Sequence, residues 1–158
     1  MAQAIAPSDN PGVIARPPLI LLVCVALGLA LDWLAPSQFL PSALQYAAGG
    51  VLIASALALA IAAIVCFRRA GTNVKTYLPA TALVAAGPYR FSRNPIYVAM
   101  ILLVLGIGVM VDSVAIVAFA VPFAVVLRYG VIAREERYLE AKFADSYRAY
   151  RARVRRWI

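Results

Sequence analysis

The chain contains four long apolar stretches, and they constrain its fold more than any other feature. They cover residues 18–34, 44–67, 96–111 and 114–133. Each approaches the roughly 20 residues that a helix needs to cross a hydrocarbon core of about 30 Å. The stretches are continuous and rich in Ala and Leu, whereas strands of a membrane barrel alternate apolar and polar residues. They predict an all-α integral membrane protein with four transmembrane helices.

Composition agrees with a bilayer location, because hydrophobic residues make up 64% of the 158 residues, more than in soluble domains. The length fits one domain over residues 1–158. Residues 1–17 are rich in Ala and Pro and are expected to form a flexible or surface-lying lead. The first apolar stretch follows Arg16, as in a signal peptide, but no small-residue cleavage site follows it. We therefore expect a retained membrane helix.

Basic residues fall at only three places: Arg16, the stretch 68–93, and the C-terminal end from Arg128 onward. The turns after the first and third apolar stretches carry none. Cytoplasmic loops of membrane proteins carry an excess of Lys and Arg, so both termini and the loop 68–95 are predicted to be cytoplasmic. The net charge of +8 is explained by this orientation, and no nucleic-acid partner is expected.

Two segments outside the apolar stretches have patterns of their own. The loop 68–95 contains Gly71, Pro79, Gly87 and Pro88, which argue against one regular element. Residues 134–151 are charged but keep Leu139, Phe143 and Tyr147 at helical spacing. They predict a C-terminal amphipathic helix that either lies on the headgroups or folds back over the loop.

The residue inventory does not favour a metal site. The chain has no His, and its acids are not arranged at metal-ligand spacing. Cys24 and Cys66 both lie in apolar stretches and are expected to pack as small hydrophobic residues. No metal ligand is therefore predicted.

The segment GPYRFSRNPIY, residues 87–97, leads into the third apolar stretch. Asn94 followed by Pro95 is typical of a helix start, with the Asn side chain capping free N–H groups. Such an end attracts a carboxylate or another polar ligand atom, and Arg90 and Arg93 add positive charge. Arg and Tyr residues also anchor membrane helices at the interface, so the segment alone fits both an anchor and a site.

A second candidate feature is the acidic pair Glu135 and Glu136, directly after the fourth apolar stretch. Arg134 and Arg137 flank the pair, and exposed ion pairs of this kind contribute only about 0 to 1 kcal/mol. The pair is either part of a site at the same interface or a simple set of ion pairs.

The two features, in this order and separated by one helical hairpin, resemble the isoprenylcysteine carboxyl methyltransferase and phospholipid methyltransferase superfamily. The resemblance runs from Gly71 to Trp157 and rests on GPYRFSRNPIY and EERYLEAKFADSYRAYRARVRRWI. It implies an integral membrane enzyme that transfers a methyl group from S-adenosylmethionine, with a cytoplasmic cofactor cleft. Bacterial relatives frequently have Asn at the position of Asn94, so we expect a bacterial inner-membrane protein.

The resemblance also implies a set of site residues. Those implied to bind the cofactor are Leu83, Val84, Tyr89, Asn94, Pro95, Ile96, Tyr97 and Glu135. Arg90, Arg93 and Glu136 are expected to support them, and no catalytic residue is assigned. Ala144 and Arg155 stand where the family has Gly and Pro. Val131 stands where the isoprenylcysteine enzymes place the arginine that engages substrate, which argues against an isoprenylcysteine carboxylate here.

A methyltransferase of this kind would act on a lipophilic acceptor that arrives from the bilayer. Two other functions remain open. A small four-helix transporter would need an ionisable residue in mid-membrane, whereas Asp32, Asp112 and Arg128 lie near predicted helix ends. A family member without catalysis would act as a membrane scaffold.

Overall fold

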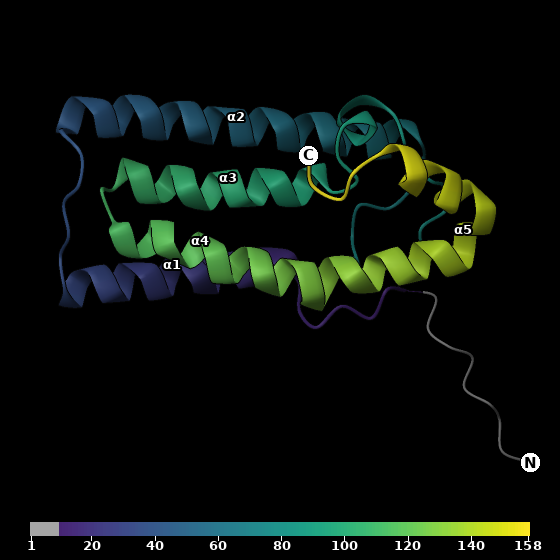
Figure 1. Ribbon diagram of the computed structural model, residues 1–158, viewed down its shortest axis with the longest axis horizontal. Helices are drawn as coiled ribbons and strands as arrows, with labels where there is room; N and C mark the ends of the chain where they lie inside the picture. The colour runs from purple at the N-terminus through teal and green to yellow at the C-terminus, as the bar shows by residue number, and fades with distance from the viewer. Residues whose placement is uncertain (1–9) are drawn as a thin grey trace, which may run out of the picture.

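The computed structural model describes residues 10–158, and all regular structure in that range is helical (Figure 1). Residues 1–9 of the expected N-terminal lead lie outside the described residues. The elements in chain order are α1 (Pro17–Leu34), α2 (Ser42–Arg69), the 3-10 helix η1 (Gly87–Arg90), α3 (Pro95–Met110), α4 (Val114–Val126), the π-helix η2 (Leu127–Ile132) and α5 (Ala133–Arg153). The all-α prediction is confirmed for this part of the chain.

Three helices are long and apolar enough to cross a membrane: α1, α2 and the continuous helix Val114–Arg153. The apolar part of the last one comprises α4 and η2. α3 is also apolar but has 16 residues, which corresponds to roughly 24 Å of helix. The fold is therefore compatible with an integral membrane protein, and a fourth crossing by α3 stays a prediction.

Glycines allow α2 and α3 to pack closely along their length. A Cβ atom on Gly49 would lie 2.7 Å from the Cα of Met110, and one on Gly106 would lie 2.8 Å from Cγ1 of Ile53. Both distances are too short for a real side chain. Small residues at such contacts are the usual way in which membrane helices approach one another.

The other helix contacts bury one apolar core. α3 lies between α2 and α4, and α4 also packs against α1 (Figure 1). The core includes Val104 of α3, Ile116 of α4, and Leu127 and Val131 of η2, all of which are fully buried. Val131 is thus a packing residue of the core.

α5 bends at Ala144 and returns over the loop between α2 and α3. Ala144 has φ 42° and ψ −116°, which interrupts the helical backbone. Beyond the bend, the Tyr150 hydroxyl donates a 2.8 Å hydrogen bond to the carbonyl oxygen of Tyr89. The backbone N–H of Arg93 donates to the carbonyl oxygen of Arg155 at 2.9 Å. Of the two expected arrangements, the C-terminal helix adopts the one that folds back over the loop (Figure 1).

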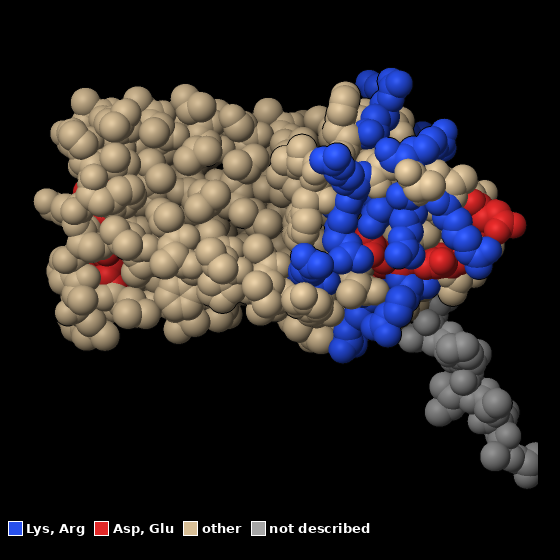
Figure 2. All heavy atoms as spheres, viewed as in Figure 1, with Lys and Arg blue, Asp and Glu red and all other residues tan. Residues whose placement is uncertain are grey.

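Basic side chains gather at one end of the molecule. Figure 2 shows Lys and Arg at the right-hand end, around the loop 70–94 and α5. We call this the basic end. At the opposite end, Oδ1 of Asp112 accepts hydrogen bonds of 3.1 Å from the backbone N–H groups of Phe39 and Leu40, which joins the two turns there.

Candidate functional site

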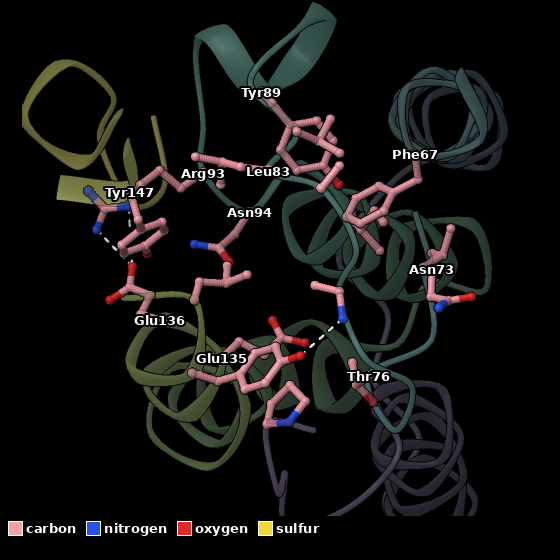
Figure 3. Close-up of a pocket in the computed structure, with 18 of the residues that line it drawn as sticks. Phe67, Asn73, Thr76, Leu83, Tyr89, Arg93, Asn94, Glu135, Glu136 and Tyr147 are labelled. Carbon is pink, nitrogen blue, oxygen red and sulfur yellow. Dashed lines mark hydrogen bonds and ion pairs between the residues drawn. The ribbon is translucent and has the colours of Figure 1, made fainter. Parts of the chain in front are cut away.

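A cavity of about 110 Å³ lies at the basic end, beneath the loop 70–94. Its walls are the end of α2, the loop, the first turn of α3 and both arms of α5 (Figure 3). These segments are distant in sequence, and the return of α5 at Ala144 brings them together. The cavity is the place where the two conspicuous motifs of the chain meet.

Glu135 and Tyr97 form the polar floor of this cavity. The Tyr97 hydroxyl donates a 2.7 Å hydrogen bond to Oε1 of Glu135. Glu135 is partly accessible from the cavity, but the surrounding protein keeps bulk water away from its carboxyl group. This burial raises the pKa of Glu135 to about 7; the Tyr97 hydrogen bond opposes the rise, and the charge of Glu136 adds to it. No basic side chain among residues 10–158 forms an ion pair with Glu135.

Glu136, the next residue, has the opposite environment. Its Oε1 accepts a 2.7 Å hydrogen bond from Nη2 of Arg93, and its Oε2 accepts one of 2.6 Å from Nη2 of Arg156. Burial acts to raise the pKa of Glu136, but the hydrogen bonds from Arg156 and Arg93 outweigh it and lower that pKa. The charge of Glu136 is already satisfied, so its role is to join the start of α3 to the C-terminal tail.

Asn94 has a different partner from the one that its position predicts. Its side chain caps no N–H group of α3; instead, Nδ2 donates a 2.9 Å hydrogen bond to the carbonyl oxygen of Arg156. The capping prediction is therefore wrong. The backbone carbonyl of Asn94 accepts from Tyr97 N at 3.0 Å, and Pro95 occupies the first turn of α3, as expected. The Asn94 side chain holds the C-terminal tail against the cavity wall, because it reaches the carbonyl oxygen of Arg156.

An aromatic wall closes the side of the cavity opposite Glu135 (Figure 3). The rings of Phe67 and Tyr89 meet edge to face, with their centroids 5.4 Å apart. Tyr89 is 6% exposed, and its backbone carbonyl is held by the Tyr150 hydroxyl. This wall is suited to an apolar or planar ligand group.

Most of the predicted site residues line this one cavity. They are Leu83, Val84, Tyr89, Arg93, Asn94, Ile96, Tyr97, Glu135 and Glu136. Pro95 and Arg90 do not: Pro95 is fully buried within the α3 packing, and Arg90 points to the exterior. Neither residue lines the cavity, and their assigned roles stay predictions.

The sequence did not reveal several further lining residues. They are Phe67, Asn73, Val74, Lys75, Thr76, Leu78, Ala80, Ala82, Tyr138, Leu139, Tyr147 and Tyr150. The spacing of Leu139, Tyr147 and Tyr150 predicts a common face of a C-terminal helix, but not that this face meets the loop. The loop residues follow no periodic pattern. No cluster among residues 10–158 has the three or more His, Cys, Asp or Glu side chains that could hold a metal ion.

Comparison with known proteins gives two partial matches to curated proteins. A 36-residue segment is 56% identical to an uncharacterized protein of Haemophilus influenzae and covers 23% of this chain and 57% of that protein. A 64-residue segment is 41% identical to the cobalt-zinc-cadmium resistance protein CzcN of Cupriavidus metallidurans and covers 40% of this chain and 29% of that protein. The matches thus span less than two thirds of either relative.

No solved structure matches the chain. The sequence model of the phospholipid methyltransferase family matches residues 44–146, which is more than half of the chain. That range includes both Tyr97 and Glu135, together with the hairpin between them. The chain belongs to the phospholipid methyltransferase family, within the isoprenylcysteine carboxyl methyltransferase-like superfamily.

Proposed function

We propose that the protein transfers a methyl group from S-adenosylmethionine to a lipophilic acceptor in the membrane. Family membership supports methyl transfer on a membrane substrate. The observation that carries the cofactor assignment is the Glu135 carboxyl, which faces the cavity and has no cationic partner among residues 10–158. Burying an unpaired acid is costly, so a cationic ligand is the natural complement of this cavity.

The residues around the cavity fit the chemistry of this cofactor. Glu135 would meet one of its positive groups or its ribose hydroxyls, and the apolar Leu83 and Val84 with the Tyr89 ring would cover the less polar parts. The volume of about 110 Å³ is below the roughly 300 to 1,000 Å³ of pockets that enclose a ligand of this size. We therefore expect the loop 70–86, which has no regular helix, to move outward when the cofactor binds.

The chain's part in the reaction is to orient the methyl donor and the acceptor and to exclude water from them. S-adenosylmethionine supplies the reactive methyl group, so the protein needs no acid–base pair of its own. Tyr97 fixes the direction of the Glu135 carboxyl through its 2.7 Å hydrogen bond. Phe67 and Tyr89 shield the opposite side from solvent. An aligned and dry site of this kind favours in-line displacement.

Binding of radiolabelled S-adenosylmethionine to the purified full chain in detergent tests the proposal. Glu135→Gln should weaken binding about tenfold or more, because hydrogen bonds to a charged group contribute about 1.5 to 3 kcal/mol. Tyr97→Phe should weaken it less, since the carboxylate stays but loses its orienting partner. Glu140→Gln is the matched control, because Glu140 pairs with Arg148 and Arg151 on the same helix outside the cavity. Undiminished binding by both site variants would overturn the site assignment.

A transporter is the second candidate, favoured only by the name of the relative, the cobalt-zinc-cadmium resistance protein CzcN. Two acids that could act in transport have structural partners: Asp112 accepts from Phe39 and Leu40, and Asp32 accepts from Ser37 at 3.3 Å. Reconstituted vesicles distinguish the candidates. Methyl transfer without metal-ion efflux supports the enzyme, and efflux that Asp112→Asn abolishes supports the transporter. Cofactor binding without methyl transfer to any membrane fraction supports a scaffold.

For the location, we infer the inner membrane of a bacterium, with both termini and the cavity in the cytoplasm. The distribution of Lys and Arg supports this orientation, because they gather around the loop 70–94 and α5 (Figure 2).

A further inference from the structure

The segment that precedes α1 runs beside η2 and the start of α5, where it is drawn in purple in Figure 1. We call residues 11–16 the strap. Pro11 lines the same cavity as Glu135, and Val13 packs against the apolar core. The strap precedes residue 44, where the match to the family model begins. This part of the cavity wall is therefore not accounted for by the family match.

Two hydrogen bonds hold the strap against the helix that carries Glu135. The carbonyl oxygen of Gly12 accepts a 2.7 Å hydrogen bond from Nη1 of Arg134, the residue before Glu135. The backbone N–H of Ile14 donates a 3.2 Å hydrogen bond to the carbonyl oxygen of Gly130 in η2. The strap thus contacts this helix on both sides of the junction between η2 and α5.

The other end of the strap reaches the loop between α2 and α3. Cζ of Arg16 lies 5.0 Å from the centroid of the Tyr77 ring, which is a cation–π distance. The strap therefore links α5 to the loop, and these are two walls of the cavity. Loss of the strap would leave both walls without this link.

Ile14 can occupy its place only because Gly130 has no side chain. A Cβ atom on Gly130 would lie 2.8 Å from Cγ1 of Ile14, which is too close for a real side chain, and its three nearest heavy atoms would all belong to Ile14. The branched Cβ of Ile restricts χ1, so Cγ1 cannot easily turn away. Gly130 also lies in a π-helix, a helical form that is frequent at functional sites.

We propose that the strap is a wall of the cofactor cavity and that Gly130 is the positioning residue that seats it. The cofactor role rests on the proposed function, whereas the seating of Ile14 on Gly130 does not. A seated strap keeps Pro11 in the wall of the cavity that Glu135 faces. Excluding water there strengthens the attraction between a carboxylate and a cationic ligand. Loss of the seat should therefore speed the release of S-adenosylmethionine.

Hydrogen–deuterium exchange of the full chain in detergent tests the seating without any cofactor. Peptides that cover the strap are followed by mass spectrometry. Gly130→Ala should raise the exchange rate of the Ile14 amide about fivefold or more, because an overpacked contact opens more readily. When Ile14→Ala is added, exchange should return to the rate of Ile14→Ala alone, since the remaining Cβ would lie 3.9 Å from the new methyl group.

Stopped release of radiolabelled S-adenosylmethionine from the same proteins tests the role in the cavity. Gly130→Ala should raise the dissociation rate constant about fivefold or more, and the double variant should restore it. Ile14→Ala alone should change little, because the Ile14 side chain is already 55% exposed. Gly50→Ala is the matched control, since its methyl group would meet only Cε of Met110 at 3.8 Å, in α2 and away from the strap.

A second pair of variants tests the strap without altering η2. Arg134→Gln removes the donor to Gly12, whereas Arg137→Gln removes the same charge from a residue whose Nε donates to the carbonyl oxygen of Ala133 within the helix. Only Arg134→Gln should speed both amide exchange in the strap and cofactor release. Equal effects of the two variants would assign the change to charge and overturn the inference. Thermal unfolding midpoints close to that of the unaltered chain show that each variant is folded.

The two measurements separate this inference from the proposed function. Faster exchange with faster release, both restored in the double variant, supports the strap as a wall. Unchanged exchange in Gly130→Ala overturns the seating, and faster exchange with unchanged release overturns the role in the cavity. An unaltered chain that binds no S-adenosylmethionine overturns the proposed function and the cofactor role together, while the exchange rates still decide the seating.

Discussion

Two neighbouring carboxyl groups at the start of α5 are placed in contrasting environments. Glu136 binds two arginines, whereas Glu135 receives only the Tyr97 hydroxyl and faces the cavity. Successive helical residues point about 100° apart, so one acid can turn toward the tail while the other turns toward the cavity. Because its neighbour fixes the helix against Arg93, Glu135 can be held in place without neutralising its own charge.

With a pKa of about 7 for Glu135, the proposed cofactor binding should depend on pH. Below pH 7 the carboxyl group of the free protein is mostly protonated, and a positively charged ligand loses its partner. Above pH 7 the carboxylate forms, so affinity should rise with pH. We expect the dissociation constant for S-adenosylmethionine to fall about tenfold between pH 6 and pH 8, as one titrating group allows.

Isothermal titration calorimetry at pH 6, 7 and 8 measures this dependence. The Glu135→Gln variant, which does not titrate, should bind weakly with little change across the range. An equally steep dependence in that variant would show that another group is responsible.

Ala144 carries backbone strain that a glycine would relieve. Its φ of 42° and ψ of −116° form a combination that disfavours any residue with a Cβ, and such strain costs of order 1 to 3 kcal/mol. Ala144→Gly should therefore raise the free energy of unfolding by about 1 kcal/mol, since part of the gain is offset by the greater freedom of glycine in the unfolded chain.

Chemical denaturation in mild detergent checks this effect. Ala141→Gly is the matched control, because Ala141 is exposed on the same helix before the bend. There the exchange should lower stability by about 1 kcal/mol. Destabilisation at both positions would contradict the strain argument.

At the scale of elements, the contact between α2 and α3 depends on which glycine faces the partner helix. A Cβ on Gly49 would lie 2.7 Å from the backbone of Met110, whereas one on Gly50 would meet only the flexible end of the Met110 side chain at 3.8 Å. Gly49→Ala should lower the free energy of unfolding by about 1 to 3 kcal/mol, as overpacking does. Gly50→Ala should be neutral or stabilising.

Unfolding of the two variants in the same detergent gives the comparison. Both add one methyl group to neighbouring residues of one helix, so a difference between them reports the close approach of α3. Equal stability would mean that the helices lie farther apart than these distances indicate.

The sequence predicted the elements better than it predicted their contacts. The apolar stretches and the Asn-Pro junction are local signals, and helices follow at those places. Asn94, however, binds the carbonyl of Arg156, 62 residues away, and no local rule anticipates such a partner. The π-helix η2 also escaped prediction, because LRYGVI reads as ordinary apolar helix.

The motif residues of the cavity followed from the family resemblance, whereas the loop residues did not. Tyr89, Tyr97 and Glu135 belong to ordered motifs with a fixed separation. Residues 73–80 have neither helical nor strand period, so their place under the fold of α5 depends on the bend at Ala144.

At the scale of the whole molecule, charge and chemistry share one end. The cavity and the basic residues around the loop 70–94 and α5 all lie there, while the turns at the other end carry no Lys or Arg (Figure 2). Because basic loops are retained in the cytoplasm during insertion, the proposed orientation would place the cavity on the cytoplasmic side, where the proposed cofactor is made available.

This orientation predicts opposite accessibility for two exposed positions at the ends of the bundle. Gln38 lies in the turn between α1 and α2, and Asp145 lies just after the bend of α5. In a chain with Cys24 and Cys66 replaced by Ala, a membrane-impermeant maleimide applied to spheroplasts should label Gln38→Cys but not Asp145→Cys. After lysis Asp145→Cys should react, which shows that its thiol is accessible to the reagent and not buried in the protein. Labelling of both positions before lysis would contradict an odd number of membrane crossings between them. The reversed pattern would place the cavity outside the cell. Either result would require a source of cofactor on that side, which argues against methyl transfer.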